Sequence, residues 1–326
     1  MRRVIELFLL LCLLLLAGCS ENELSSNLDN KLRIGVMLSD AGLGDQSFSD
    51  SAFNGLEKAR EELGILFDYR ELKEVGDYET GLQELIDQGN DLIVGLGYMI
   101  EEDLKKVAEK YPDKQFVIVD AVVDLPNVTS VTFKEHEGSF LIGAIAGMRT
   151  NSDIVGFVGG SDTPLIRKFL NGFSQGVAAT NPEAVVLHHF AEDFNNDKLG
   201  EELAKELIND GADFIYPSAG FTGVGVINIA QQEGIYSFGG VDSDQYYLGE
   251  KTVVTSMLKN IDVAMYKLAK ELVENGQVAD GHITLGLADD GVGIAPIRVI
   301  SLTKEETEQI EKLTEKIKTN AITVSE

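Results

Sequence analysis

Short apolar runs alternate with amphipathic stretches through most of the chain. In the first half, the apolar runs predict strands at Arg33–Leu38, Phe67–Leu72, Asp91–Leu96, Phe116–Asp120 and Val128–Phe133. Between them, apolar residues recur at three- and four-residue spacing, which predicts helices at Ser51–Leu63, Tyr78–Gln88 and Glu101–Lys110. This alternation is typical of an α/β domain in which helices cover both faces of a mostly parallel sheet.

The pattern restarts after residues 149–153, which indicates a second domain of the same class. Strands are predicted at Ile154–Val158, Val185–His189, Asp213–Pro217 and Tyr236–Val241, with helices at Leu165–Ala178, Leu199–Asn209 and Gly225–Gln232. The remaining residues predict strands at Val253–Leu258 and Ile283–Leu287 and helices at Val263–Asn275 and Thr303–Lys318. We therefore expect two doubly wound lobes, residues 31–150 and 151–255, each completed by part of residues 256–326.

Residues 1–18 have the pattern of a secretory signal peptide. Arg2 and Arg3 precede an apolar run of about 11 residues, which is too short to span a membrane as a helix. Leu16-Ala17-Gly18-Cys19 resembles the lipobox of bacterial lipoproteins, which implies cleavage before Cys19 and acyl chains, such as palmitate, on that residue. We expect residues 19–30 to be a lipid-modified flexible tether that holds the protein on the extracytoplasmic face of the cell membrane. The alternative is an ordinary signal peptide with an incidental cysteine.

Composition narrows the class of partner. The chain of 326 residues has a formal net charge of −27, which disfavours nucleic acid and anionic lipid because both carry the same sign. Removal of the signal peptide also removes Cys12 and leaves Cys19 as the only cysteine, so no intramolecular disulfide is expected.

Carboxylates and glycines gather where the predicted strands end. Open parallel sheets bind ligands at the carboxyl ends of their strands, where the sequence places Asp40, Asp45, Asp120, Asp242 and Asp244. Carboxylates accept hydrogen bonds from paired hydroxyls, glycines such as Gly223 admit close backbone approach, and Phe48 or Phe221 could stack on a ring. The pattern favours a neutral, hydroxyl-rich ligand with a flat apolar part. Alternatively, these residues simply cap helices and form turns.

The candidate motifs for catalysis and for metal binding are incomplete or lie in the wrong structural context. Gly172-Phe-Ser-Gln-Gly176 matches the nucleophile pattern G-x-S-x-G, but it falls inside a predicted helix instead of a strand-to-helix turn. The loop that starts at Asp193 lacks the glycine and the glutamate of a calcium site, and the four histidines have no zinc-binding spacing. We expect no catalytic residues, no metal and no cofactor.

Taken together, the strand-end motifs resemble the basic membrane protein family, bacterial lipoproteins of the purine-nucleoside receptor type that serve ABC importers. The resemblance covers about residues 32–300. The matching segments are Asp40-Ala-Gly-Leu-Gly-Asp45-Gln-Ser-Phe48, Phe116–Asp120, Gly138–Gly143, Val155–Gly160, Gly172–Gly176, Gly239–Gln245, Thr255–Lys259 and Leu285–Gly293.

The resemblance implies a type I periplasmic-binding-protein fold, with two lobes joined by a multi-strand hinge, and a nucleoside-like ligand. Phe48 is expected to stack on the base, Asp242 and Lys259 to hold ribose hydroxyls, and Asp120 to serve base or sugar. The pattern also carries over to Asp40, Asp45 and Asp244. Two positions depart from it, since Ser49 replaces the usual Asn and Phe221 a small residue.

Three functional hypotheses follow. The first is a lipid-anchored, monomeric, non-enzymatic receptor that delivers a nucleoside, with a purine favoured, to an ABC permease and its ATPase. The second is a sensory or regulatory lipoprotein of the same fold that signals through a membrane partner. The third is a nucleoside hydrolase, which ligand recovered chemically intact would exclude. Neighbouring genes for an ATPase and permeases would favour the first over the second.

Overall fold

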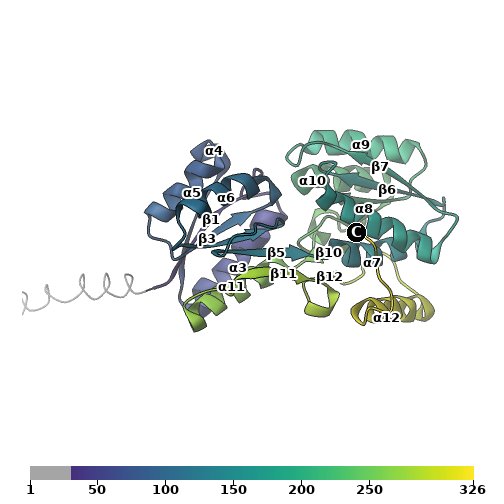
Figure 1. Cartoon of the computed structure of the whole chain (residues 1–326). Helices are drawn as coiled ribbons and strands as arrows, with labels where there is room; N and C mark the ends of the chain where they lie inside the picture. Colours follow the sequence, from purple (N-terminus) through teal and green to yellow (C-terminus); the bar gives the residue numbers. More distant parts are fainter. Residues whose placement is uncertain (1–30) are drawn as a thin grey trace, which may run out of the picture.

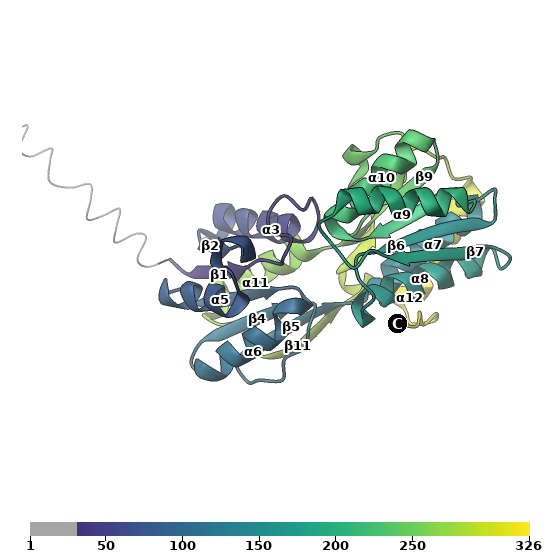
Figure 2. The ribbon, with the colours of Figure 1, turned by 90° about the horizontal axis from the view of Figure 1, so that it is seen from above.

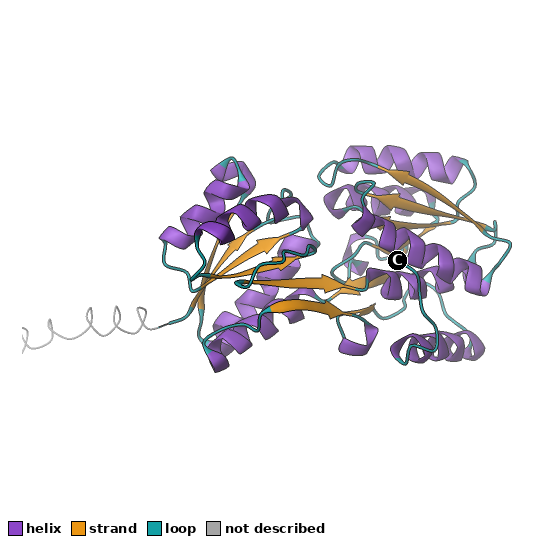
Figure 3. Ribbon diagram, viewed as in Figure 1, coloured by secondary structure: helices purple, strands orange, loops and turns teal. Residues whose placement is uncertain are grey.

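Two six-stranded sheets, each flanked by helices, form the part of the protein that the structure describes (Figures 1 and 3). The computed structural model describes residues 31–326. The first sheet has the order β11-β5-β4-β3-β1-β2 and defines lobe 1, and the second has the order β12-β10-β9-β8-β6-β7 and defines lobe 2. The predicted α/β class is confirmed. Cys19, the signal peptide and the tether lie outside the described residues. No helix within residues 31–326 has the length and hydrophobicity needed to cross a membrane.

In lobe 1 all strand pairs are parallel, and helices cover both faces of the sheet. Along β1 the side chain of Val36 belongs to the cluster that includes α3 and α11, whereas Met37 belongs to the cluster that includes α5 and α6. The lobe 1 strands are β1 (Arg33–Met37), β2 (Leu66–Arg70), β3 (Leu92–Leu96), β4 (Gln115–Val119), β5 (Val128–Phe133) and β11 (Gly281–Leu285). Its helices are α3 (Phe48–Leu63), α4 (Leu72–Val75), α5 (Tyr78–Asp87), α6 (Glu101–Lys110) and α11 (Ile261–Asn275), with a 3₁₀ turn η1 (Tyr98–Ile100).

Lobe 2 repeats this architecture, with one antiparallel strand at its edge. Only β12 pairs antiparallel, with β10. The strands are β6 (Ile154–Gly159), β7 (Val185–Phe190), β8 (Phe214–Ser218), β9 (Tyr236–Gly239), β10 (Val253–Lys259) and β12 (Val292–Ile294). The helices are α7 (Glu135–Arg149), α8 (Pro164–Thr180), α9 (Asp197–Asn209), α10 (Gly220–Glu233) and α12 (Lys304–Lys318), with 3₁₀ turns η2 (Tyr246–Leu248) and η3 (Leu287–Asp289).

Glycines set the close packing of α7 on α8. A Cβ atom at Gly143 would overlap the carbonyl oxygen of Phe173, and one at Gly176 would overlap that of Phe140. The segment Gly172-Phe-Ser-Gln-Gly176 lies inside α8, as predicted, and its glycines face the neighbouring helix. The nucleophile-like pattern is therefore a helix-packing motif.

Within residues 31–326 the chain changes lobe three times, between β5 and α7, between β10 and α11, and between β11 and β12. Helix α11 lies beside α3 in lobe 1, as Figure 2 shows. Helix α7 packs on α8, so it belongs with lobe 2 although it ends at Arg149. The expected division at residues 149–153 separates these two helices, whereas in the structure the first crossing precedes α7.

Candidate ligand-binding site

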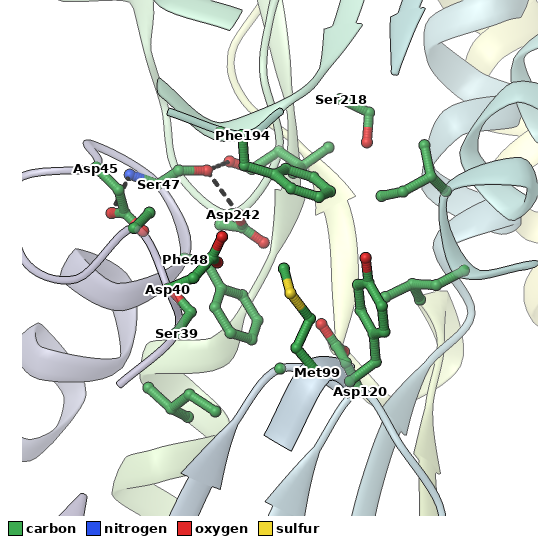
Figure 4. Close-up of a pocket in the computed structure, with 18 of the residues that line it drawn as sticks. Ser39, Asp40, Asp45, Ser47, Phe48, Met99, Asp120, Phe194, Ser218 and Asp242 are labelled. Carbon is green, nitrogen blue, oxygen red and sulfur yellow. Dashed lines mark hydrogen bonds between the residues drawn. The ribbon is translucent and has the colours of Figure 1, made fainter. Parts of the chain in front are cut away.

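A pocket lies between the lobes, where strands of both sheets end (Figure 4). Lobe 1 supplies residues that follow β1, β3 and β4, and lobe 2 supplies residues at the ends of β8 and β9. This is the edge at which open parallel sheets bind ligands. The lining comprises Ser39, Asp40, Ala41, Asp45, Ser47, Phe48, Tyr78, Leu96, Gly97, Tyr98, Met99, Asp120, Leu165, Ile166, Phe169, Phe194, Ser218, Ala219, Gly220, Val241, Asp242 and Lys259.

The structure brings together most of the residues that the sequence nominated for the site. Asp40, Asp45, Phe48, Asp120, Asp242 and Lys259 all line the pocket. Phe221, Gly223 and Asp244 do not. These three need a different account.

Phe221 and Gly223 lie in α10 instead of a binding loop. The helix begins at Gly220, five residues before the predicted start at Gly225, so both residues sit in its first turn. Gly223 is buried beside Pro217, and a Cβ atom added to Gly223 would lie 3.2 Å from the Cβ of Pro217. The aromatic residues that lobe 2 contributes to the pocket are instead Phe169 of α8 and Phe194, whose carbonyl accepts a hydrogen bond from the amide of Thr222. Phe194 follows β7, so its position after a strand was the available signal.

Asp244 has a structural partner outside the pocket. Its carboxylate forms an ion pair of 2.8 Å with Arg298 and accepts a hydrogen bond from the amide of Tyr246. Both partners belong to lobe 2 and its C-terminal extension. This side chain therefore ties the segment after β12 to the loop after β9.

Asp45 lines the pocket but uses its carboxylate to cap α3. Its oxygens accept hydrogen bonds from the amides of Ser47 at 2.9 Å, Ser49 at 2.8 Å and Asp50 at 3.2 Å. Burial raises the pKa of Asp45 despite these donors. The arrangement fixes the start of the helix, and with it the position of Phe48.

Lys259 forms the centre of a buried charge cluster. Its Nζ lies 2.5 Å from Asp120 Oδ2 and 3.4 Å from Glu135 Oε1. Rings of Phe48, Phe133 and Phe169 surround it, with centroids 5.2–5.9 Å away. Burial opposes the charge, yet the neighbouring carboxylates hold the pKa of Lys259 above its ordinary value. Glu135, which the sequence did not nominate, is thus a direct partner of a pocket residue.

Asp120 directly follows β4 and Asp242 lies three residues after β9, and both occupy the left-handed region of backbone space, at φ 71° and φ 80°. Residues other than glycine rarely occupy this region, and functional sites are where such strain concentrates. Asp242 Oδ2 accepts a hydrogen bond of 2.7 Å from the hydroxyl of Ser47. Asp120 Oδ1, Asp242 Oδ1 and the hydroxyl of Ser218 are buried and have no hydrogen-bond partner in the described part of the chain.

Buried polar atoms without partners are uncommon in folded proteins, because each loses its hydrogen bonds to water and gains none from the protein. The residues that carry these atoms line the pocket between the lobes, so the atoms are available to a ligand. Burial also raises the pKa of Asp242 to about 7. The geometry suits a ligand that presents hydroxyl or N–H groups to carboxylates. Within residues 31–326, no group of three or more His, Cys, Asp or Glu side chains is arranged to hold a metal ion.

Comparison with known proteins identifies the family. Residues 32–326 match the family model described as "ABC transporter substrate-binding protein PnrA-like". The chain belongs to this family. Basic membrane protein B of Borreliella burgdorferi is 31% identical over 86% of this chain and 86% of its own length. An uncharacterized lipoprotein of Pyrococcus abyssi is also 31% identical, over 87% of this chain and 74% of its own. The family resemblance read from the strand-end motifs is confirmed.

A solved structure supports the same assignment of fold. An ABC transporter solute-binding protein of Aeropyrum pernix K1 superposes with a TM-score of 0.82 and 26% identity, over 90% of this chain and 92% of its own. The two lobes and their parallel sheets are therefore those of a periplasmic-binding-protein type receptor, as predicted.

Proposed function

We propose that this substrate-binding protein captures a nucleoside, with a purine favoured, between its lobes and presents it to an ABC permease and its ATPase. Its family is one of solute-binding proteins, not of enzymes. The identity of the ligand, the lipid on Cys19 and the lack of catalysis are parts of the proposal.

The observation that carries the proposal is the pairing of an aromatic surface with buried, unpaired carboxylate oxygens in one pocket. Phe48 and Phe194 reach the pocket from opposite lobes (Figure 4) and offer flat faces to a base. Asp120 Oδ1 and Asp242 Oδ1 offer acceptors for the vicinal hydroxyls of a ribose. A nucleoside has both parts, a flat base and a pair of sugar hydroxyls.

Charge argues against phosphorylated ligands. The single pocket lysine, Lys259, is already paired with Asp120 and Glu135, so no free cation in the lining awaits a phosphate. Asp40 adds a further carboxylate, and burial raises its pKa. A nucleoside monophosphate would meet repulsion that the parent nucleoside avoids.

Anchoring fits the same role. A receptor held on the membrane by a lipid at Cys19 remains at high effective concentration beside its permease. The polar residues 20–30 would leave the lobes free to close. Mass spectrometry of the protein from membranes tests this part, since an acylated Cys19 and loss of residues 1–18 are expected.

Titration calorimetry tests ligand binding. The purified protein, stripped of bound molecules by unfolding and refolding, is titrated with adenosine, guanosine, inosine, uridine, ribose and adenosine monophosphate. We expect at least one nucleoside to release heat with a single site, and ribose and the monophosphate to bind far more weakly. If no nucleoside gives binding heat at high protein concentration, the proposal is wrong. Chromatography of the ligand after long incubation should recover it intact.

A further inference from the structure

Glu135 is a buried carboxylate beside the pocket that the proposed binding mode leaves unused. Glu135 is the first residue of α7, directly after the first crossing between the lobes, and it is 1% exposed. Among residues 31–326, neither carboxylate oxygen has a hydrogen-bond partner, and the one ion pair of Glu135 is with Lys259 Nζ at 3.4 Å. This distance is longer than the 2.5 Å between Lys259 and Asp120. Glu135 itself does not line the pocket.

The buried charges around Lys259 do not balance. Three carboxylates, those of Asp120, Glu135 and Asp242, surround a single ammonium group. Burying unbalanced charge away from water is expensive, and a carboxyl group in this position gains a proton instead. A proton shared within the cluster reduces its net charge from two negatives to one.

The surrounding elements supply no compensating cation. Asp45, from the loop before α3, adds negative charge near Asp242, and Tyr216 of β8 faces both Asp242 and Glu135. Lys168 of α8 acts on Glu135 only from a distance, because its ammonium pairs with Glu326 at 3.2 Å. His136 lies next along α7, with Nδ1 4.0 Å from the same Glu326.

We propose that the empty site holds one proton shared between Asp242 and Glu135, that a bound nucleoside displaces it, and that Glu135 is the positioning residue that keeps it there. This inference rests on the proposed nucleoside ligand. Hydroxyl donors of the ligand favour the ionised form of Asp242, so the carboxyl proton leaves to solvent as the hydrogen bonds form. No other bond forms or breaks.

The electrostatics support this linkage. Burial raises the pKa of both Asp242 and Glu135 to about 7. Because Asp242 and Glu135 both interact with Lys259, their titrations are coupled, and the proton is shared by the pair. Ligand affinity should therefore increase as the pH rises through about 7 and level off above it. Between pH 8.5 and pH 5.5 we expect a loss of roughly ten- to thirty-fold in affinity.

Calorimetry with inosine, adenosine and guanosine in phosphate, imidazole and Tris buffers counts the protons. The dependence of the binding heat on the ionisation heat of the buffer should give release of about half a proton near pH 7 and almost none at pH 8.5. If nucleoside binds but its heat does not depend on the buffer at any pH, no proton is released. That result overturns the proton displacement and leaves the proposed function intact. Absence of heat with all three nucleosides overturns the proposed function and this inference together.

Variants at two positions on α7 isolate the role of Glu135. Glu135→Gln removes the charge at nearly constant shape, so we expect less proton release at pH 7 and a pH profile shifted to lower pH. Glu137→Gln is the matched control, since Glu137 is also buried but accepts a hydrogen bond from the amide of Leu287 and pairs with Lys134. Its proton count should stay that of the wild type.

Glu135→Asp restores the charge and should return the profile toward wild type. A folded Glu135→Gln protein with an unchanged proton count overturns the role of Glu135. If that variant does not fold by circular dichroism, infrared difference spectroscopy of the wild type decides. Inosine should then abolish a protonated-carboxyl band, and its persistence overturns the proposal.

Discussion

The hydroxyl of Ser47 donates a hydrogen bond of 2.7 Å to the carboxylate of Asp242 and thereby joins the two lobes beside the pocket. Ser47 precedes α3 in lobe 1, and Asp242 follows β9 in lobe 2. The bond occupies Asp242 Oδ2 and leaves Oδ1 without a partner. One carboxylate therefore has an oxygen committed to holding the lobes together and another available to a ligand.

Ser47→Ala should weaken nucleoside binding without unfolding the protein. The substitution removes a hydroxyl that lies 2.7 Å from Asp242 Oδ2 and 3.0 Å from the carbonyl oxygen of Val241. It leaves both oxygens of Asp242 unpaired, which costs the closed state about 1–2 kcal/mol. We expect the dissociation constant to rise roughly five- to thirty-fold. Ser243→Ala is the control, because its hydroxyl spans the lobes over a longer 3.4 Å to the carbonyl of Gln46. Equal effects in calorimetry would contradict a special role for Ser47.

Asp242→Ala should lose more affinity than Ser47→Ala. Truncation leaves ligand hydroxyls buried without an acceptor, at a penalty of about 2–3 kcal/mol, or roughly thirty- to two-hundred-fold in the dissociation constant. Asp244→Ala provides the comparison two residues away, where the carboxylate pairs with Arg298 outside the pocket. That control should retain near wild-type affinity. Unchanged binding by Asp242→Ala would remove this residue from the site.

Much of the fold was predictable because the sheets are buried on both faces. Strands such as Leu92–Leu96 are wholly buried, so they appear in the sequence as continuous apolar runs. The lobe boundary was harder to predict. Helix α7 is followed by a polar break at residues 150–153, yet its glycines commit it to α8 in lobe 2. The boundary between the lobes is therefore set by the packing of α7 on α8, which a local sequence pattern does not reveal.

The pocket was predictable where it depends on strand ends and hidden where it depends on tertiary contacts. Asp120 and Asp242 follow buried strands and line the pocket as expected. Phe221 was misplaced because α10 begins before the segment that its apolar periodicity marked. Glu135 could not be recognised from the sequence, since its ion-pair partner Lys259 is far away along the chain.

Phe194→Ala should lower nucleoside affinity, whereas Phe221→Ala should not. Phe194 lines the pocket opposite Phe48, so its loss removes an aromatic face from the base, worth about 1 kcal/mol or more once lost burial is included. We expect a rise in the dissociation constant of roughly five-fold or more. Phe221 is half-buried in α10 and does not line the pocket. Calorimetry of the two variants side by side separates these assignments, and the reverse ranking would overturn them.

Gly176→Ala should destabilise lobe 2. The added Cβ overlaps the carbonyl oxygen of Phe140 on α7, so the two helices must separate, at a cost of about 1–3 kcal/mol. Thermal unfolding followed by circular dichroism should show a melting temperature lowered by a few degrees. Ser174→Ala, in the same helix and motif, should melt as the wild type does. A larger loss from Ser174→Ala would argue against the packing account of this motif.

The acidic cluster should make the unliganded protein less stable as the pH rises. Folded Asp242 and Glu135 have pKa values of about 7, above their ordinary values of 3.8 and 4.5, so the folded state binds their protons more tightly. The stability that this supplies is complete below about pH 4 and is lost as the pH rises through about 7. Burial lowers the pKa of His136, which gives the opposite slope up to about pH 6.5.

Asp242→Asn isolates the contribution of the cluster from that of His136. At pH 8 the unliganded variant should be more stable than the wild type, by on the order of 1–3 kcal/mol, because it buries no excess charge there. At pH 5 the difference should shrink. Asp244→Asn makes the same charge change at a site paired with Arg298 and should show no such gain. Urea unfolding at both pH values measures this, and a Asp242→Asn protein that is less stable than wild type at pH 8 would falsify the account. The expected gain, together with lost affinity, marks a carboxylate kept for its ligand and not for the fold.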